Sequence, residues 1–324
     1  MRKARQRLAV TALVMAAATI LLGSTAVFAA GKKLVIGFAQ TGAESEWRTA
    51  NTDSIKSAAE EAGAQLKFYD GQQKQENQIR AIRAFIAQKV DVIILAPLVT
   101  TGWDTVLFEA KQAHIPVILE SRNVSVRDLS TWTTFVGSDF VEEGRQAGRW
   151  LVERTKASKA DVNIVELQGT VGSDPANDRK KGFEEVIKTD PKFKVIRSQT
   201  GDFTRAKGKE VMEAFLKAEG RKINVLYAHN DDMAIGAIQA IEEAGMKPGK
   251  DVLVIGVDGV KGAFEAMVAG KMNVTVECNP LLGPQLMAAA GKAAAGETLP
   301  RWIKSIERVF PAEVAAEELP RRKY

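Results

Sequence analysis

Polar residues follow several apolar runs of this sequence at the point where each run ends, and their types could do chemistry. Asn230 comes after the apolar run 223–227 and before the helical pattern 233–244. Four more polar residues hold the same position after other runs: Gln40, Ser121, Arg122 and Asp258. In open parallel sheets, ligands bind beyond the carboxyl ends of the strands. Side chains that donate and accept hydrogen bonds at such an edge suit a ligand rich in hydroxyl groups.

Each of these residues also has a simpler interpretation when it is taken alone. One residue of the triplet 230–232 must cap the helix that follows, and we expect Asp231 to do so, which leaves Asn230 free. Asp258 and Gly259 form a common turn dipeptide, and arginines such as Arg122 and Arg179 are more often surface charges. The prediction of a ligand site therefore rests on the cluster.

Two aromatic residues, Trp47 and Phe203, fall in stretches that we expect to be loops. Their flat apolar faces could cover a sugar ring, although Trp47 taken alone would be assigned to the core. Together with the polar cluster, they favour a carbohydrate as the ligand.

The sequence lacks the motifs of catalysis that we would look for. Gly208-Lys209 is followed by Glu210, so the Ser or Thr of a P-loop is missing, and there is no G-x-S-x-G elbow. His114 and His229 are the only histidines, and neither has a metal ligand at a useful spacing. Strand alternation turns His229 away from Asn230, which favours a structural role for it. We therefore expect no enzyme activity, no cofactor and no metal.

Composition limits the class of protein. The 324 residues are 45% hydrophobic and 26% charged, which fits about two globular domains. Residues 1–29 read as a signal peptide, with a basic head, an apolar core and small residues before a cut after Ala29. Removal of its four basic residues lowers the formal net charge from +5 to +1, which gives no electrostatic case for nucleic acid. The single cysteine, Cys278, excludes an internal disulfide.

After residue 30 the sequence alternates strand and helix patterns in two successive units. The first unit has predicted strands at 33–39, 65–69, 91–96, 115–119 and 133–137 and helices at 50–62, 78–90 and 103–113. The second has predicted helices at 140–155, 179–188, 205–218 and 233–244 and strands at 162–167, 193–196, 223–227, 251–257 and 272–276. A helix at 282–295, a last strand near 303–309 and a polar tail follow. The pattern predicts an α/β fold with parallel sheets, and the absence of a linker predicts several short crossings between the halves.

Several motifs resemble those of the ribose/galactose-type periplasmic sugar-binding proteins of ABC importers. They are Glu166-Leu-Gln-Gly-Thr-Val-Gly172, Arg179-Lys-Lys-Gly-Phe183, Gly201-Asp-Phe-Thr-Arg205, Ala228-His-Asn-Asp-Asp-Met233 and Gly256-Val-Asp-Gly259. The stretches 40–48 and 70–78 are similar to the galactofuranose-binding members in particular. The resemblance covers the chain after the leader.

The resemblance implies a type I periplasmic binding protein with two Rossmann-like lobes, joined by a three-crossing hinge. The lobes would be 31–137 plus 279–306 and 138–278 plus 307–324. Family contacts fall on eight positions: Gln40, Trp47, Arg48, Arg122, Arg179, Phe203, Asn230 and Asp258. The implied partners are a monosaccharide, such as galactofuranose or a related furanose or pentose, and an ABC permease in the inner membrane. A periplasmic monomer without a cofactor is expected.

Three positions depart from the family pattern, and other classes of protein must be weighed. Ala96 replaces an Asn of the ribose binders, Ser121 replaces an Asp, and Cys278 replaces a Gln. A carboxylate acceptor is therefore missing at 121, since alternation turns Glu120 to the opposite face. A repressor of the lactose-repressor type would carry a DNA-binding segment where this chain has its leader. A protein for another small polar ligand, or one that feeds a chemoreceptor, stays an alternative.

Overall fold

The structure, a computed structural model, describes residues 33–324, so the signal peptide expected at 1–29 lies outside the described residues. The first lobe is built on a parallel sheet with the strand order β11-β5-β4-β3-β1-β2. Its strands are β1 (Val35–Gln40), β2 (Gln65–Asp70), β3 (Val92–Leu95), β4 (Val117–Glu120), β5 (Thr134–Gly137) and β11 (Trp302–Lys304). Its helices are α1 (Glu46–Glu61), α2 (Gln75–Ala87), α3 (Asp104–Gln112) and α9 (Gly283–Ala294), with a 3₁₀ turn η1 at Leu129–Thr131.

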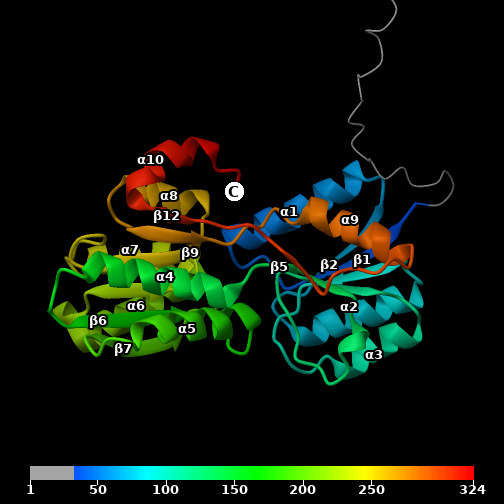
Figure 1. Cartoon of the computed structure of the whole chain (residues 1–324), viewed down its shortest axis with the longest axis horizontal. Helices are drawn as coiled ribbons and strands as arrows, with labels where there is room; N and C mark the ends of the chain where they lie inside the picture. Colours follow the sequence, from blue (N-terminus) through cyan, green and yellow to red (C-terminus); the bar gives the residue numbers. More distant parts are fainter. Residues whose placement is uncertain (1–32) are drawn as a thin grey trace, which may run out of the picture. The chain divides into compact units, whose positions relative to one another are not determined.

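The inner strands β1, β3, β4 and β5 of this sheet are buried on both faces, which explains their apolar runs. Ile36 and Phe38 of β1 pack with α1 and α9 on one face. Ile93 and Leu95 of β3 pack with α2 and α3 on the other face. The sheet is thus fixed between two helical layers, as Figure 1 shows on its right side, and the tips of its strands are held in place.

The second lobe is built on a sheet with the order β12-β10-β9-β8-β6-β7, in which β12 alone is antiparallel to its neighbour. Its strands are β6 (Val162–Gln168), β7 (Phe193–Thr200), β8 (Val225–Ala228), β9 (Leu253–Asp258), β10 (Val274–Glu277) and β12 (Val309–Pro311). Its helices are α4 (Phe140–Thr155), α5 (Asp174–Ile187), α6 (Arg205–Glu219), α7 (Asp231–Glu243), α8 (Lys261–Val268) and α10 (Ala315–Glu318). Short 3₁₀ turns lie at η2 (Gly220–Lys222), η3 (Ala312–Val314) and η4 (Leu319–Arg321).

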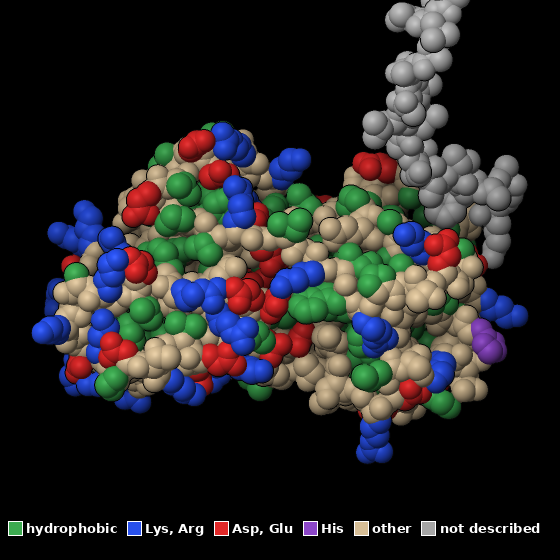
Figure 2. Space-filling model, viewed as in Figure 1, with side chains coloured by type: hydrophobic (Ala, Val, Ile, Leu, Met, Phe, Trp, Pro, Cys, Tyr) green, Lys and Arg blue, Asp and Glu red, His purple; other side chains and the backbone are tan. Residues whose placement is uncertain are grey.

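Helices α4 and α5 pack against each other on one face of this sheet so closely that their backbones are in contact. A Cβ atom at Gly144 would lie 2.2 Å from the carbonyl oxygen of Arg179, and one at Gly182 would lie 1.9 Å from that of Val141. The outer surface of the pair carries interspersed acidic and basic side chains (Figure 2), among them the ion pair of Arg145 with Glu185 at 2.7 Å. The two glycines therefore fix how α5 is placed on α4.

The chain passes between the two sheets three times within the described residues. The first crossing joins β5 to α4 at 138–139, the second joins β10 to α9 at 278–282, and the third joins β11 to β12 at 305–308. This confirms the predicted α/β fold with two lobes and three crossings. No helix within 33–324 combines the length and apolar character needed to cross a membrane.

Five details of the predicted element map differ in the structure. The single strand expected at 303–309 is two short strands, β11 and β12, which belong to different sheets. Helix α8 was not predicted, and the polar tail contains α10. Helix α1 begins at Glu46 instead of residue 50, because Ser45 caps it by accepting a hydrogen bond from the backbone N–H of Arg48. Helix α5 begins at Asp174 instead of residue 179, with a proline in its first turn.

Candidate functional site

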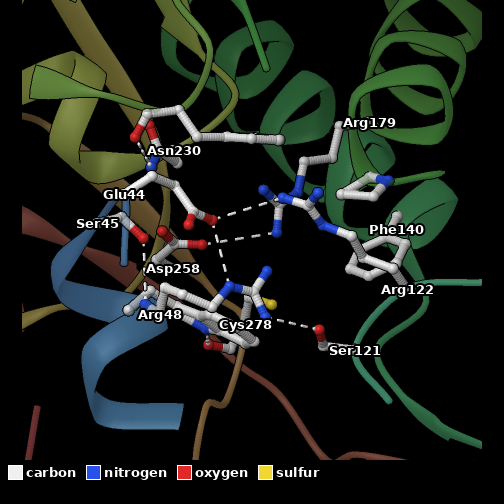
Figure 3. Close-up of a pocket in the computed structure, with 13 residues that line it drawn as sticks. Glu44, Ser45, Arg48, Ser121, Arg122, Phe140, Arg179, Asn230, Asp258 and Cys278 are labelled. Atoms are coloured by element: carbon white, nitrogen blue, oxygen red, sulfur yellow. Dashed lines mark hydrogen bonds and ion pairs between the residues drawn. The ribbon is translucent and has the colours of Figure 1, made fainter. Parts of the chain in front are cut away.

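A small cavity lies between the two lobes and is lined by side chains from both (Figure 3). Its lining residues are Glu44, Ser45, Trp47, Arg48, Ser121, Arg122, Phe140, Pro175, Arg179, Phe203, Asn230, Asp258 and Cys278. The free volume is about 30 Å³, which is room for water but not for a larger molecule. Seven of the eight predicted contact residues meet here.

Gln40 is the exception, and we remove it from the candidate site. Its amide nitrogen donates to Oδ1 of Asn51 at 2.9 Å and to Oγ1 of Thr52 at 3.1 Å. Its amide oxygen accepts from the backbone N–H of Thr41 at 2.8 Å. The side chain is fully buried, so Gln40 holds the end of β1 to α1 instead of lining the cavity.

The first turn of α1 presents Trp47 and Arg48 to the cavity. Trp47 lies in this helix and not in a loop as predicted. Its indole N–H donates to the backbone carbonyl of Cys278 at 2.6 Å, which ties the helix to the second crossing. The guanidinium of Arg48 lies 4.7 Å from the centre of the Trp47 ring. Each side chain therefore helps to fix the orientation of the other.

Glu44 is a site residue that the predicted contacts did not include. Its Oε1 accepts from Nε of Arg48 at 3.2 Å and lies 3.7 Å from Nη2 of Arg122. Burial raises the pKa of Glu44, but the charges of the two arginines outweigh it and hold the pKa below its usual value. Oε2 of Glu44 is buried and has no hydrogen-bond partner. The sequence signal that could have identified Glu44 is its spacing, because it lies four residues before Arg48.

Ser121 and Arg122 come from the end of β4. The hydroxyl of Ser121 accepts from Nη1 of Arg48 at 3.0 Å. Arg122 donates from Nη1 to the carbonyl of Leu98 at 3.0 Å, and its guanidinium lies 5.4 Å from the centre of the Phe203 ring. Burial, and then the positive charge of Arg48, lower the pKa of Arg122 to about 10. Position 121 supplies no carboxylate, but the nearby carboxylate of Glu44 contacts both Arg48 and Arg122.

Arg179 is the arginine that the second lobe contributes to the cavity lining. It lies in the second turn of α5, not at the start of a helix as predicted. Its Nε donates to Oε2 of Glu143 at 2.7 Å, Nη1 donates to the carbonyl of His229 at 2.6 Å, and Nη2 lies 3.6 Å from Oδ1 of Asp258. Burial lowers the pKa of Arg179, but the neighbouring carboxylates raise it further, so the guanidinium stays charged. The close packing of α4 on α5 brings Glu143 within reach.

Asn230 caps α7, so the prediction that Asp231 would do so is wrong. The amide oxygen of Asn230 accepts from the backbone N–H of Met233 at 3.0 Å, and its amide nitrogen donates to the carbonyl of Phe203 at 3.1 Å. Asp231 instead accepts from the backbone of Gly259 at 2.7 Å, because its side chain points across to the loop after β9. Asn230 therefore orders the loop that carries Phe203 while its side chain still lines the cavity.

Three of the lining residues have a strained backbone. Ser121, Phe203 and Asp258 have φ values of 50°, 62° and 130°, a region that favours glycine. Such outliers cluster at ligand sites in proteins. Gly169 has a matching role, since a Cβ there would lie 1.9 Å from the Phe203 ring.

His229 and Glu120 lie outside the cavity lining, which agrees with the orientations predicted from strand alternation. The ring of His229 contacts Glu166 at 3.1 Å and is fully buried. Glu120 accepts from the amide of Asn51 at 2.7 Å. Neither side chain points toward the predicted ligand.

This combination of two α/β lobes, three crossings and a polar cavity between the lobes defines a class of binding protein. The chain belongs to the periplasmic binding protein domain family, whose sequence pattern matches residues 36–298. It is 49% identical over 314 residues to the galactofuranose-binding protein YtfQ of Escherichia coli K12, which covers 96% of this chain and 97% of that protein.

Solved structures extend this similarity. A Mycobacterium smegmatis protein in complex with β-D-fucofuranose shares 55% identity and a TM-score of 0.88, over 90% of this chain and 95% of that one. The periplasmic binding component of the arabinose ABC transporter of Shewanella sp. ANA-3, bound to α- and β-L-arabinofuranose, shares 50% identity and a TM-score of 0.86, over 89% and 95% of the two chains.

Proposed function

We propose that this protein is the periplasmic substrate-binding component of an ABC sugar importer. It captures a monosaccharide in the furanose form between its lobes and delivers it to a membrane permease. The observation that carries this proposal is the lining of the cavity, where Arg48, Arg122 and Arg179 meet the carboxylates of Glu44 and Asp258. The furanose ligands of the relatives support the same ligand class.

The side chains that line the cavity suit a small ring with several hydroxyl groups. A guanidinium donates two parallel hydrogen bonds, and a carboxylate accepts two, so each can hold a pair of neighbouring hydroxyls. In the proposed complex, Glu44 and Asp258 accept from hydroxyls, and the three arginines donate to ring and hydroxyl oxygens. Trp47 and Phe203 supply apolar faces for the C–H bonds of the ring. We propose a binding role without catalysis for this set of groups.

The lobes must separate to admit a sugar, because the cavity has only about 30 Å³ of free space. In the proposed mechanism the sugar replaces the ion pairs that the lining groups make with one another. Contacts from both lobes are complete only when the lobes meet, so the sugar favours the closed form by differential affinity. We propose that the lobes comprise 31–137 plus 279–306 and 138–278 plus 307–324, and that they rotate about the three crossings.

The proposed setting of the protein follows from its leader and family. We propose that the signal peptide 1–29 is removed on export and that a periplasmic monomer then delivers the sugar to the permease. Mass spectrometry of the exported protein would test the cut after Ala29.

Calorimetric titration with L-arabinose, D-galactose, D-fucose and D-ribose tests the ligand class. Carbon NMR of the bound, labelled sugar then identifies its ring form, since furanose and pyranose rings give different anomeric shifts. We expect at least one of these sugars to bind at one site as a furanose. Failure of all four sugars to bind, or a bound pyranose, would contradict the proposal.

A further inference from the structure

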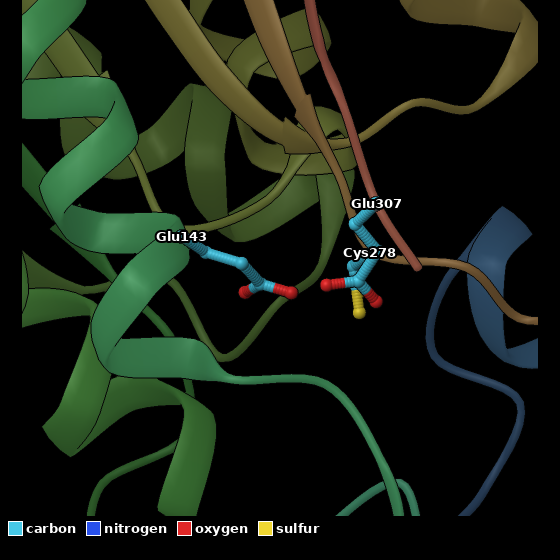
Figure 4. A group of neighbouring side chains, drawn as sticks. All are labelled: Glu143, Cys278 and Glu307. Atoms are coloured by element: carbon cyan, nitrogen blue, oxygen red, sulfur yellow. The ribbon is translucent and has the colours of Figure 1, made fainter. Parts of the chain in front are cut away.

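A cluster of ligand-type atoms lies at the hinge, beside the sugar site. Glu143, Cys278 and Glu307 each direct one oxygen or sulfur atom into the same space, and these atoms lie within 4.8 Å of one another (Figure 4). Glu143 comes from α4, Cys278 from the second crossing and Glu307 from the third crossing. The cluster therefore joins a helix of the second lobe to two of the three hinge segments.

One oxygen in this cluster is buried without a partner. Glu143 is only 2% exposed, and its Oε1 has no hydrogen-bond partner, whereas Oε2 is held by Arg179 at 2.7 Å. Leaving a carboxylate oxygen buried and unpaired is costly unless a cation or a donor approaches it. In Figure 4 the carboxylate of Glu143 points toward Glu307 and Cys278, so one of its oxygens faces the space that the three side chains share.

The charge around the cluster is also unbalanced. Arg179 faces Glu143, and Asp258 and Glu307 share its field, so one cation serves three carboxylates. The cluster is therefore a place where an added positive charge would be favourable.

Cys278 lines the sugar cavity, but the other two members of the cluster, Glu143 and Glu307, also line a second groove. This groove of about 350 Å³ is lined by Glu143, Gln146, Ser305 and Glu307, among other residues. The amide oxygen of Gln146, one helical turn after Glu143, is a second buried oxygen without a partner. The nearby ammonium of Lys304 is held by Asp139 at 2.8 Å. An ion in solution would thus meet acceptor atoms along this path.

We propose that Glu143, Cys278 and Glu307 form a binding site for a divalent cation with affinity for sulfur, such as Zn²⁺. A thiolate and two carboxylates are suitable ligands for this ion, and a water molecule could complete four-fold coordination. On binding, Cys278 gives its thiol proton to solvent and the sulfur coordinates the ion.

The supporting hydrogen bonds that such a site needs are already present. Oε2 of Glu143 is oriented by Arg179. Oε1 of Glu307 accepts from the backbone N–H of Asn279 at 3.2 Å, from the hydroxyl of Ser305 at 2.7 Å and from the hydroxyl of Ser138. All three bonds end on Oε1, so they orient the carboxylate without using Oε2. Partners of this kind fix the ligand geometry of metal sites.

The experiment uses the reduced, untagged chain in metal-free buffer. Zn²⁺ is titrated in competition with a chromophoric chelator, and Co²⁺ serves as a spectroscopic probe. We expect one ion per chain and a sulfur-to-cobalt charge-transfer band in the near ultraviolet. Cys278→Ser should abolish the band. Cys278→Ser and Glu307→Gln should each weaken Zn²⁺ binding by more than the roughly 10- to 100-fold that loss of a supporting partner costs.

Glu142→Gln is the matched control, since Glu142 lines the same groove but lies outside the cluster. It should bind Zn²⁺ as the unaltered chain does. The cobalt spectrum of the unaltered chain tests for sulfur coordination even if a variant folds poorly. Absence of a one-to-one complex, a complex without the sulfur band, or equal Zn²⁺ affinity in folded Cys278→Ser would overturn the proposal. None of these results depends on the identity of the sugar.

Discussion

The backbone N–H of Glu46 donates a hydrogen bond to Oδ2 of Asp232 at 2.8 Å, and this bond joins the first lobe to the second. Nη2 of Arg205 lies 2.8 Å from both Oε1 of Glu46 and Oδ1 of Asp232. We call these three residues the interlobe latch. They do not line the sugar cavity, so the latch stabilises the closed form without contacting the ligand.

Weakening the latch should lower sugar affinity. Arg205→Ala removes an ion pair whose arginine is 41% exposed and leaves Asp232 without its cation. An exposed pair contributes up to about 1 kcal/mol, so we expect the dissociation constant to rise by up to about fivefold. Calorimetry measures this change, and small-angle scattering should show a larger open fraction before the sugar is added.

Lys209→Ala is the control for this prediction. Lys209 lies on the same helix as Arg205 and pairs with Glu243 at 2.7 Å, but both partners belong to the second lobe. Its removal should leave sugar affinity unchanged. An equal loss of affinity in both variants would show that the effect of Arg205→Ala does not arise from closure.

Arg179→Lys should weaken sugar binding by about 2–4 kcal/mol, because lysine cannot supply the paired hydrogen bonds of a guanidinium. Lysine is used because alanine would leave Glu143 and Asp258 without their shared cation. Lys181→Ala, an exposed position on the same helix, is the control. Calorimetry at one site per chain measures both variants. Unchanged affinity in Arg179→Lys would remove Arg179 from the proposed site.

Strand and helix patterns predicted most of the fold because they reflect burial directly. Residues 92–96 and 254–257 are buried on both faces of a sheet, and such apolar runs can be recognised without tertiary information. The sequence did not predict that β11 joins the sheet of the first lobe and β12 the sheet of the second. Each of these strands has three residues, so partner and sheet are decided by distant packing and not by a local period.

Site residues could be predicted from the sequence where their position at the end of a strand placed them at the cavity. They could not be predicted where hydrogen-bond partners determined the direction of the side chain. Asp258 ends β9 and Arg122 lies two residues after β4, so topology alone brought them to the cavity. Gln40 holds an equivalent position, but Asn51 and Thr52 on α1 take up its amide. The sequence alone does not show that these two residues bind the amide of Gln40.

Sugar affinity should depend on pH through Asp174. Its Oδ2 accepts from the backbone N–H of Asn123 in the other lobe at 3.0 Å, so closure buries it. Burial, and then the negative charge of Asp178, raise the pKa of Asp174 from 3.8 to about 6. The N–H of Asn123 and the charge of Arg122, both from the first lobe, oppose this rise. We predict that burial by the first lobe outweighs them, so that the closed form holds the proton more tightly than the open form. Protonation therefore favours closure, and this contribution is lost as the pH rises from about 4 to about 6.

Titrations at several pH values test this prediction. The difference of about two pH units limits the contribution of Asp174 to about 100-fold in affinity. Asp174→Asn should flatten the profile between about pH 4 and pH 6, whereas Asp161→Asn, at an exposed position just before β6 begins, should leave it unchanged. An unaltered slope in Asp174→Asn would contradict the assignment.

Glu44→Gln should weaken sugar binding by about 1.5–3 kcal/mol. The carboxylate of Glu44 neutralises Arg48 and Arg122, and its Oε2 is buried without a partner beside the cavity, where a sugar hydroxyl could donate to it. An amide keeps the shape but loses the charge that makes such a hydrogen bond strong. Glu61→Gln, an exposed position at the other end of α1, should bind sugar as the unaltered chain does.

Ser121→Asp decides whether Glu44 replaces the missing family carboxylate. Oγ of Ser121 accepts from Nη1 of Arg48, so an aspartate there would reach the same guanidinium. Alone, this change should not tighten binding, because it adds a negative charge next to Glu44 and the buried Glu120. In the Glu44→Gln background it should recover part of the lost affinity, since a carboxylate again lies beside Arg48. Equal losses of affinity from Glu44→Gln with and without Ser121→Asp would mean that the two positions act independently, and that Glu44 contacts a different part of the sugar.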